Sequence, residues 1–160
     1  MAFRFPRFKT QKHILLLTAM LAIFGANIFF IRERPRESFV CFAENCFWVE
    51  VARTDFQKMR GLQFRENLDQ NQGMIFLFKN EGKYNFWMKD TKIPLDIIWL
   101  DGDKRVVFIK ENAQPCKEGS SCPSAVSPGS AKYVLEINGG LAGQMGITPG
   151  SQAEFKNIDE

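Results

Sequence analysis

Histidine is nearly absent from this chain of 160 residues. The single histidine, His13, lies beside an apolar segment and outside the region expected to fold. Ser-His-Asp and Cys-His catalysis within one chain is therefore excluded, and so are the common zinc sites that need imidazole ligands. An enzyme built on this sequence would have to work with Asp, Glu, Lys, Tyr or Cys. We expect no cofactor and no metal ion.

The chain also lacks the strongly basic surface that nucleic acid requires. Its net charge of +3 comes from 21 Lys and Arg against 18 Asp and Glu. Residues 1–37 hold seven of the basic residues and only two of the acidic ones, so the remainder is mildly acidic. A nucleic-acid partner is therefore not expected. The composition, 45% hydrophobic and 24% charged, is that of an ordinary globular domain.

One long hydrophobic run is present near the N-terminus. Residues 14–31 contain no charged side chain, and as a helix they would span about 27 Å, enough for a hydrocarbon core. They predict a transmembrane anchor that follows a short basic cytoplasmic segment, residues 1–13. A charged stalk, residues 32–39, would then lead into one extracytoplasmic β-rich domain, residues 40–160.

A signal peptide is the alternative interpretation of the same run. Its best cleavage site, at residues 24–26, has Phe24 where a small residue is needed. We therefore favour a retained anchor or an uncleaved signal. Either interpretation predicts a single-pass protein of the inner or plasma membrane, with a cytoplasmic N-terminus and a periplasmic or extracellular domain.

Cysteine is scarce but even in number, at Cys41, Cys46, Cys116 and Cys122. An even count in a small exported domain predicts two disulfide bonds. Three pairings are open, and pairing of nearest neighbours would close loops worth roughly 2 kcal/mol each. A metal site made of all four thiolates is the alternative, which the odd spacings and the oxidising compartment disfavour. No C-x-x-C motif indicates a thioredoxin-like role.

Short apolar runs separated by turn residues predict a mainly β (β-rich α+β) fold. We expect a compact antiparallel β-barrel or sandwich-like domain with one or two short helices, preceded by one N-terminal transmembrane helix. Asp55 is the expected cap of a helix that ends before Gly61. The expected strands are residues 47–52, 73–78, 84–91, 95–100, 105–110, 133–137 and 153–155, with a long loop at residues 113–130 and a helical turn after residue 140.

Several short motifs follow one another in a distinctive order. They are RGL at 60–62, GMIF at 73–76, FWMKDT at 86–91, IPLDII at 93–98, PC at 115–116, CP at 122–123 and YVLE at 133–136. Over residues 47–155 the chain resembles the uncharacterised family called domain of unknown function number one hundred and ninety-two. The resemblance implies a β-barrel or sandwich-like fold and pairing of Cys116 with Cys122, which leaves Cys41 to Cys46. It implies no reaction, and the chain departs from the family at Asp90, where asparagine is usual.

The motif at residues 86–91 supplies candidate ligand-binding groups. On a strand, Trp87, Lys89 and Thr91 would share one face, while Phe86 and Met88 would face the core. An aromatic surface beside a cation and a hydroxyl is suited to an anionic sugar or another carboxylated ligand. The alternative is that Trp87 is half-buried packing and that Lys89 lies along it to reach water.

Asp96 shares its strand face with large apolar residues, so its carboxylate needs a partner or a raised pKa. In a functional interpretation Asp96 is a general acid or base, with Glu136 as the second carboxylate. In a structural one it forms a buried ion pair, with Arg60 or Lys89, or caps backbone groups. The candidate ligand-binding residues are Arg60, Trp87, Lys89, Thr91 and Asp96, and the weaker catalytic candidates are Asp96 and Glu136.

Three functions fit these features. The favoured one is a membrane-anchored module that binds a small molecule or a component of the cell envelope, without catalysis. A histidine-free hydrolase of envelope glycans, using Asp96 and Glu136, is the second. A structural partner of another envelope protein is the third.

Overall fold

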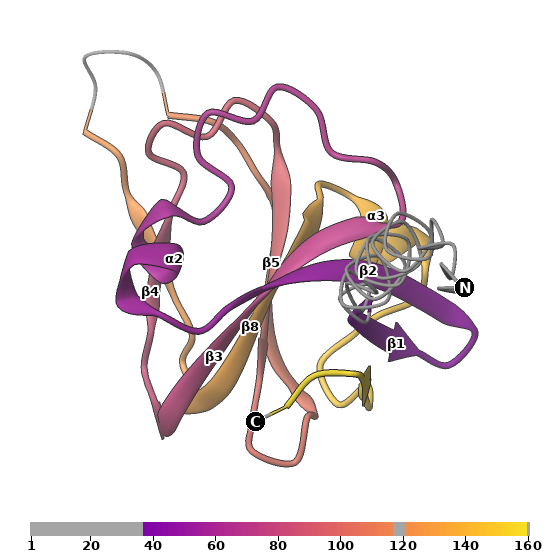
Figure 1. The fold of residues 1–160 in the computed structure, drawn as a ribbon. Coiled ribbons are helices and arrows are strands. Elements are labelled where there is room, and N and C mark those ends of the chain that lie inside the picture. Colours follow the sequence, from indigo (N-terminus) through magenta and orange to yellow (C-terminus); the bar gives the residue numbers. More distant parts are fainter. Residues whose placement is uncertain (1–36, 117–120, 160) are drawn as a thin grey trace, which may run out of the picture. The chain divides into compact units, whose positions relative to one another are not determined.

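The protein is represented by a computed structural model that describes residues 37–116 and 121–159 (Figure 1). The expected anchor and most of the expected stalk lie outside these ranges. Within the ranges, no helix is long and apolar enough to cross a membrane. Membrane insertion through residues 14–31 therefore stays a prediction.

The fold is mainly β, as predicted, and is built on one seven-stranded sheet. The order across the sheet is β6-β5-β8-β3-β2-β1-β9, and a small ribbon of β4 and β7 forms a second sheet. The strands are β1 (Phe39–Phe42), β2 (Asn45–Ala52), β3 (Gln72–Gly82), β4 (Asn85–Trp87), β5 (Leu95–Leu100), β6 (Val106–Ala113), β7 (Ser124–Val126), β8 (Ala131–Asn138) and β9 (Glu154–Lys156). The helices are α2 (Asp55–Arg60) and α3 (Leu141–Gln144).

The expectation of a wholly antiparallel sheet is wrong at one place. Strands β2 and β3 pair in parallel, with Trp48 opposite Gln72 and Ala52 opposite Phe76. Parallel neighbours need a long crossover connection, and residues 53–71, which include α2, provide it. This crossover matters for function because it carries α2 along the outside of the sheet.

The main sheet curls into a half-barrel. Its two edges meet at an isolated antiparallel bridge between Arg105, beside β6, and Gln152, before β9. The amide of Val106 also donates to the carbonyl of Ser151 at 2.9 Å. These contacts pair part of the edge backbone that an open sheet would leave exposed.

Apolar side chains fill both faces of the sheet. Every residue of β5 is buried, and alternate residues enter two separate clusters: Ile98 and Leu100 join one, while Ile97 and Trp99 join the other. The ribbon of β4 and β7 covers the second cluster, where Phe86 packs edge-to-face on Phe76 with ring centroids 4.8 Å apart. The predicted burial of Phe86 and Met88 is thus confirmed.

The N-cap of helix α2 is one residue earlier in the chain than predicted. Thr54, rather than Asp55, is the cap: its hydroxyl accepts from the amide of Gln57, and the Gln57 side chain accepts from the amide of Thr54. This reciprocal pair satisfies free amides at the start of the helix. Gly61 ends the helix with φ of +48°, as its position predicts.

The predicted strand at residues 84–91 is shorter than expected. Only Asn85–Trp87 is extended. The amide of Thr91 donates to the carbonyl of Met88 at 3.2 Å, and Asp90 has φ of +55°. This left-handed turn, a conformation that Asp and Asn tolerate better than most residues, ends the strand after Trp87.

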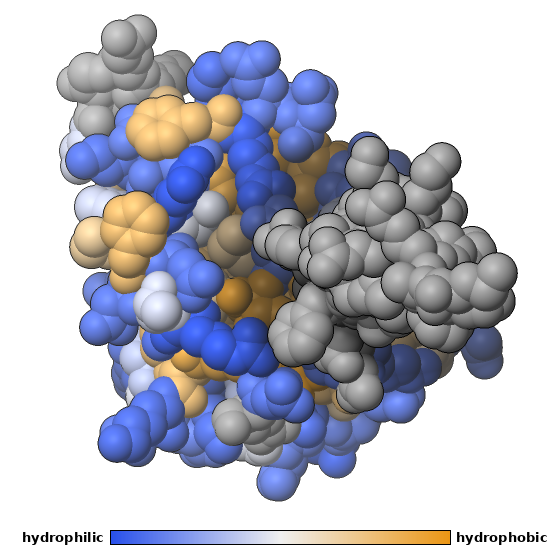
Figure 2. Space-filling view, in the orientation of Figure 1, coloured by the Kyte–Doolittle hydropathy of each residue, from blue (hydrophilic) through white to orange (hydrophobic). Residues whose placement is uncertain are grey.

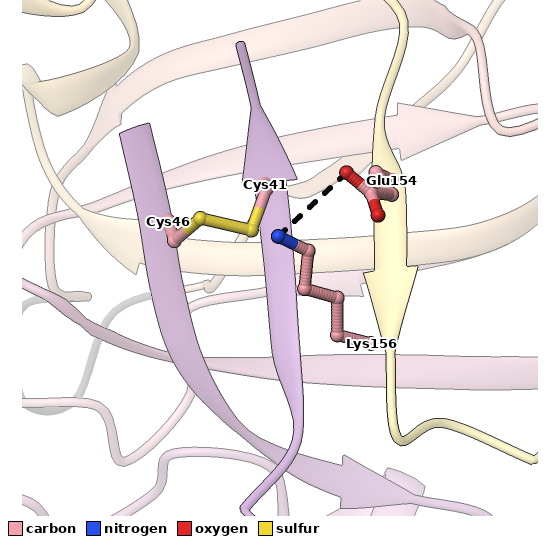
Figure 3. The surroundings of a disulfide bond; sticks show 4 residues. All are labelled: Cys41, Cys46, Glu154 and Lys156. Atoms are coloured by element: carbon pink, nitrogen blue, oxygen red, sulfur yellow. Dashed lines mark ion pairs between the residues drawn. A yellow bond between two sulfur atoms is a disulfide. The ribbon is translucent and has the colours of Figure 1, made fainter. Parts of the chain in front are cut away.

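Both cysteine pairs implied by the family resemblance are present in the structure. Cys41 bonds Cys46 across the β1–β2 hairpin, beside the ion pair of Lys156 and Glu154 on β9 (Figure 3). Cys116 bonds Cys122, and the described residues contain no free cysteine. The first bridge therefore joins two neighbouring strands at one end of the sheet order.

Candidate ligand-binding site

A buried carboxyl group lies beneath the end of α2. It belongs to Glu136 on β8, which sits opposite Ile97 on β5 and Met74 on β3. The side chain is only 5% exposed. It lies on the face of the sheet that the crossover and the β4–β7 ribbon cover, so these two surface segments decide what reaches it.

Burial raises the pKa of Glu136 to about 8, because the ionised form loses its hydration. Across residues 37–116 and 121–159, no hydrogen bond or ion pair joins its carboxyl group to another side chain or to the backbone. No fully enclosed side-chain oxygen there is left without a partner, so the carboxyl oxygens must retain some access to solvent. With this pKa the protonated form predominates at neutral pH, and it can both donate and accept a hydrogen bond.

A narrow cavity of about 30 Å³ connects Glu136 with the surface. Gly61 forms part of its roof: a Cβ atom there would lie 3.4 Å from the Phe76 ring and 3.8 Å from Oε2 of Glu136. The other walls come from the end of α2, from Trp87 and from Thr91. The volume suits a single polar group about the size of a water molecule.

Two wider clefts flank this cavity and share α2 as a wall. A cleft of about 460 Å³ lies between α2 and β2 and reaches Arg60 and Gly61. A cleft of about 390 Å³ lies between α2 and β4 and is lined by Met59, Phe78, Tyr84 and Trp87. The small cavity thus opens at α2, where a larger molecule has room on either side.

Exposed apolar side chains gather around the same helix. No residue of α2 is buried, and Figure 2 shows hydrophobic side chains standing out from the hydrophilic surface over α2 and β4. Four of the six large exposed hydrophobic residues in the described part of the chain line the cavity or its clefts: Phe56 (69%), Met59 (71%), Phe64 (62%) and Trp87 (50%). An apolar cluster beside a polar cavity is the usual composition of a ligand site.

The structure brings together most of the ligand-binding residues predicted from the sequence. Arg60, Trp87 and Thr91 line the cavity of Glu136, and the Lys89 ammonium lies 5.4 Å from the centroid of the Trp87 ring. The expectation that Trp87, Lys89 and Thr91 share one face of a strand is wrong. Thr91 is buried whereas Trp87 is exposed, because the chain turns between them. These residues meet through that turn instead.

Asp96 lies on the opposite face of the sheet. Its position on β5 is opposite Ile137, the neighbour of Glu136, so the two carboxyl groups point away from each other. Asp96 is fully buried and accepts from the amides of Asn112 (2.7 Å), Gly140 (2.9 Å) and Ala142 (2.8 Å). It thereby joins β5 to the end of β6 and to the start of α3, and contacts neither Arg60 nor Lys89.

Two contributors to the site were not predicted from the sequence. Lys58, on α2, lines both the cavity and the cleft beside β4, and Met59 lies next to it. Phe56 and Met59 are three residues apart and share one face of the helix, but the sequence alone does not show that this face stays exposed.

A second cavity, of about 610 Å³, lies between β6 and the β4–β7 ribbon. Its apolar floor includes Phe86, Ile97 and Phe108. Its lining reaches Cys116 and Ser121, which border residues outside the described part of the chain. The cavity of Glu136, by contrast, is lined only by described residues and is the candidate site.

The fold and the site define a class: a small β domain in which a helix-bearing crossover covers a buried acid on a curled sheet. The chain belongs to the DUF192 family, described as uncharacterised, whose model matches residues 40–155. The expectation from the sequence motifs is thus confirmed.

Relatives with similar sequences and structures cover most of the chain. A UPF0127 protein of Thermococcus sibiricus is 27% identical over 117 residues, which is 70% of this chain and 68% of that protein. A crystal structure of a protein of unknown function from Novosphingobium aromaticivorans is 41% identical, with a TM-score of 0.66 over 74% of this chain and 83% of its own. Another, described as a candidate transcription regulator from Sinorhizobium meliloti, is 30% identical, with a TM-score of 0.68 over 76% and 94%.

Proposed function

We propose that this protein is a membrane-anchored extracytoplasmic module that binds a small molecule or an envelope component in the Glu136 cavity. One observation carries the binding proposal: the Glu136 side chain is 95% buried, its carboxyl group has no bonding partner in the described chain, and it borders a cavity. The carboxyl oxygens keep only limited contact with water, so a hydrogen bond from a ligand in the cavity would improve their solvation.

The surroundings indicate what such a ligand offers. A hydroxyl group fits the small cavity and can accept from, and donate to, the protonated Glu136. The half-exposed ring of Trp87 at the cavity wall provides a flat surface for the ring of the same ligand. A saccharide of the cell envelope combines these two properties.

The anchor and the compartment belong to the same proposal. Residues 14–31 support membrane attachment through their length and lack of charge. The two cysteine pairs support an oxidising compartment, since disulfide bonds persist there. Alkaline extraction of membranes tests attachment: the full chain should stay in the pellet, and a variant with Leu16→Arg and Phe24→Arg should be released.

Native mass spectrometry of the full chain, purified in detergent from its own membranes, tests ligand binding. We expect a retained small molecule that is lost in Glu136→Ala and Trp87→Ala and kept in Glu136→Gln, whose amide still donates and accepts. Trp48→Ala is the matched control, because Trp48 is 40% exposed and lines neither the cavity nor its two clefts. Equal retention in all variants would contradict the proposal.

A second candidate, docking onto another envelope protein, is favoured by the exposure of Phe56, Met59 and Phe64. The same measurement separates the two candidates, because a retained protein would depend on Phe56 and not on Glu136. The hydrolase with paired carboxyl groups is not proposed further, since Asp96 and Glu136 face opposite sides of the sheet.

A further inference from the structure

We infer that the ligand of the Glu136 cavity is an acidic saccharide, whose carboxylate binds one of the two cations of α2 that line the cavity, Lys58 or Arg60, while one of its hydroxyl groups reaches Glu136. The inference rests on the proposed binding function and specifies the ligand class. It depends on three features of the site: the cations at its mouth, the uncharged group at its base, and the aromatic wall between them.

The cations at the mouth have no acidic partner among the described residues. Lys58 and Arg60 both line the cavity, and Lys89 lies against Trp87. In the described part of the chain, no carboxylate lies within ion-pair distance of these three groups. Two other cations, in contrast, form ion pairs with carboxylates: Arg65 with Glu50 at 2.6 Å, and Lys92 with Glu66 at 2.7 Å.

These cations do not neutralise the acid at the base. A cation close to Glu136 would lower its pKa, yet burial is the one resolved cause of its shift, and that shift is upward. Lys58 instead lies over the Phe78 ring, with Nζ 4.8 Å from the centroid. The site therefore has an uncharged hydrogen-bonding base and a cationic mouth.

This distribution of charge selects among ligands. An ammonium group would be repelled at the mouth by Lys58 and Arg60, whereas a neutral molecule would use only the base. A carboxylate at the mouth gains charge-assisted hydrogen bonds, of which the Arg60 guanidinium can form two at once. The ligand should therefore carry an anionic group at one end and a hydroxyl group at the other.

The wall between the two ends suits a sugar ring. The cleft beside β4 contains Trp87 together with the stacked rings of Phe78 and Tyr84, whose centroids are 3.5 Å apart. Flat apolar surfaces of this kind contact the carbon–hydrogen faces of pyranose rings, while the ring hydroxyls point to polar groups. A hexuronic acid has both the ring and the carboxylate.

Isothermal titration calorimetry on the full chain in detergent tests this inference with three probes: digalacturonate, its dimethyl ester and neutral galactobiose. We expect digalacturonate to bind at least tenfold more tightly than the other two at pH 6. The double variant Lys58→Gln, Arg60→Gln should lose this preference and still bind the neutral probes. Lys156→Gln, which changes a cation on the edge strand β9, is the matched control and should keep the preference.

The outcomes separate the inference from the proposed function. Equal affinities for the three probes would overturn the inference that the ligand is acidic. The proposal that the protein binds a saccharide would still stand. An unchanged preference in the double variant would also overturn the inference, because the carboxylate would then bind elsewhere. If no probe binds at 10 mM, both the acidic saccharide and the saccharide itself are refuted.

Discussion

The substitution Glu136→Gln should change how the stability of the protein depends on pH. In the folded state burial raises the pKa of Glu136 from 4.5 to about 8, whereas the unfolded chain has an ordinary carboxyl group. Between these two values the folded protein therefore holds a proton that the unfolded chain releases. Linkage then requires that the free energy of unfolding falls as pH rises from about 4.5 to about 8.

The size of the effect follows from the same two values. At 1.36 kcal/mol for each pH unit, the interval corresponds to a loss on the order of 5 kcal/mol. Relaxation of the cavity and entry of water would reduce it. Glutamine has nearly the same shape and no proton to release, so the Glu136→Gln variant should lack this loss. It should match the wild-type protein at pH 4.5 and exceed it at pH 9.

Urea unfolding of the full chain in detergent, at several pH values between 4.5 and 9, provides the assay. Tryptophan fluorescence follows unfolding, since one of the three tryptophans, Trp99, is fully buried in the core and becomes exposed to water when the protein unfolds. Glu154→Gln is the control, because Glu154 is 69% exposed in its side chain, and it should follow the wild-type curve. If the free energy of unfolding changed with pH in the same way in the wild-type protein and in Glu136→Gln, the claim that Glu136 is buried and protonated would be refuted.

Three further substitutions test other parts of the account. Asp96→Asn should lower the free energy of unfolding by about 3 kcal/mol, because Oδ1 of asparagine can accept from Asn112 and Gly140 but its Nδ2 would face the amide N–H of Ala142, so one backbone donor loses its acceptor and the other bonds lose their charge. Asp90→Asn should change it by less than about 0.5 kcal/mol, since both residues tolerate the left-handed conformation there. Replacing Cys41 and Cys46 together by serine should cost about 2 kcal/mol. All three are measured by urea unfolding at pH 6.

Each of these substitutions has an outcome that contradicts its reasoning. A cost below about 1 kcal/mol for Asp96→Asn would show that its backbone contacts do not organise the start of α3. A large cost for Asp90→Asn would mean that its charge, rather than its backbone conformation, matters. When both proteins are reduced, the cysteine variant and the wild-type protein should be equally stable, and a remaining difference would point to packing of the sulfur atoms.

Local patterns in the sequence predicted much of the fold. The strands expected at residues 47–52, 95–100 and 105–110 are observed as β2, β5 and β6, with β5 and β6 paired antiparallel. The parallel pairing of β2 with β3 was missed, because alternation shows which side chains face inward and not the direction of a neighbouring strand. Strand β1 was missed because it was assigned to the stalk and to a cysteine-closed loop.

The site was harder to predict than the fold. The face of Asp96 was predicted correctly, since it has the same parity on β5 as the buried Ile98 and Leu100. Its partners were not, because backbone amides from β6 and α3 lie far away in the sequence. Glu136 is buried without a hydrogen-bonding partner in the described chain because the crossover between β2 and β3 covers it. A local sequence pattern does not show which distant segment will cover a side chain.

The central claim is that Glu136 is a protonated group that faces a ligand. The most direct measurement is the carbon-13 shift of its side-chain carboxyl, followed by NMR across pH 4–10 in the full chain, with and without digalacturonate. The account predicts a midpoint near 8 for the free protein and a higher midpoint with the saccharide, which binds the protonated form. A midpoint near 4.5, or one that the saccharide leaves unchanged, would contradict it.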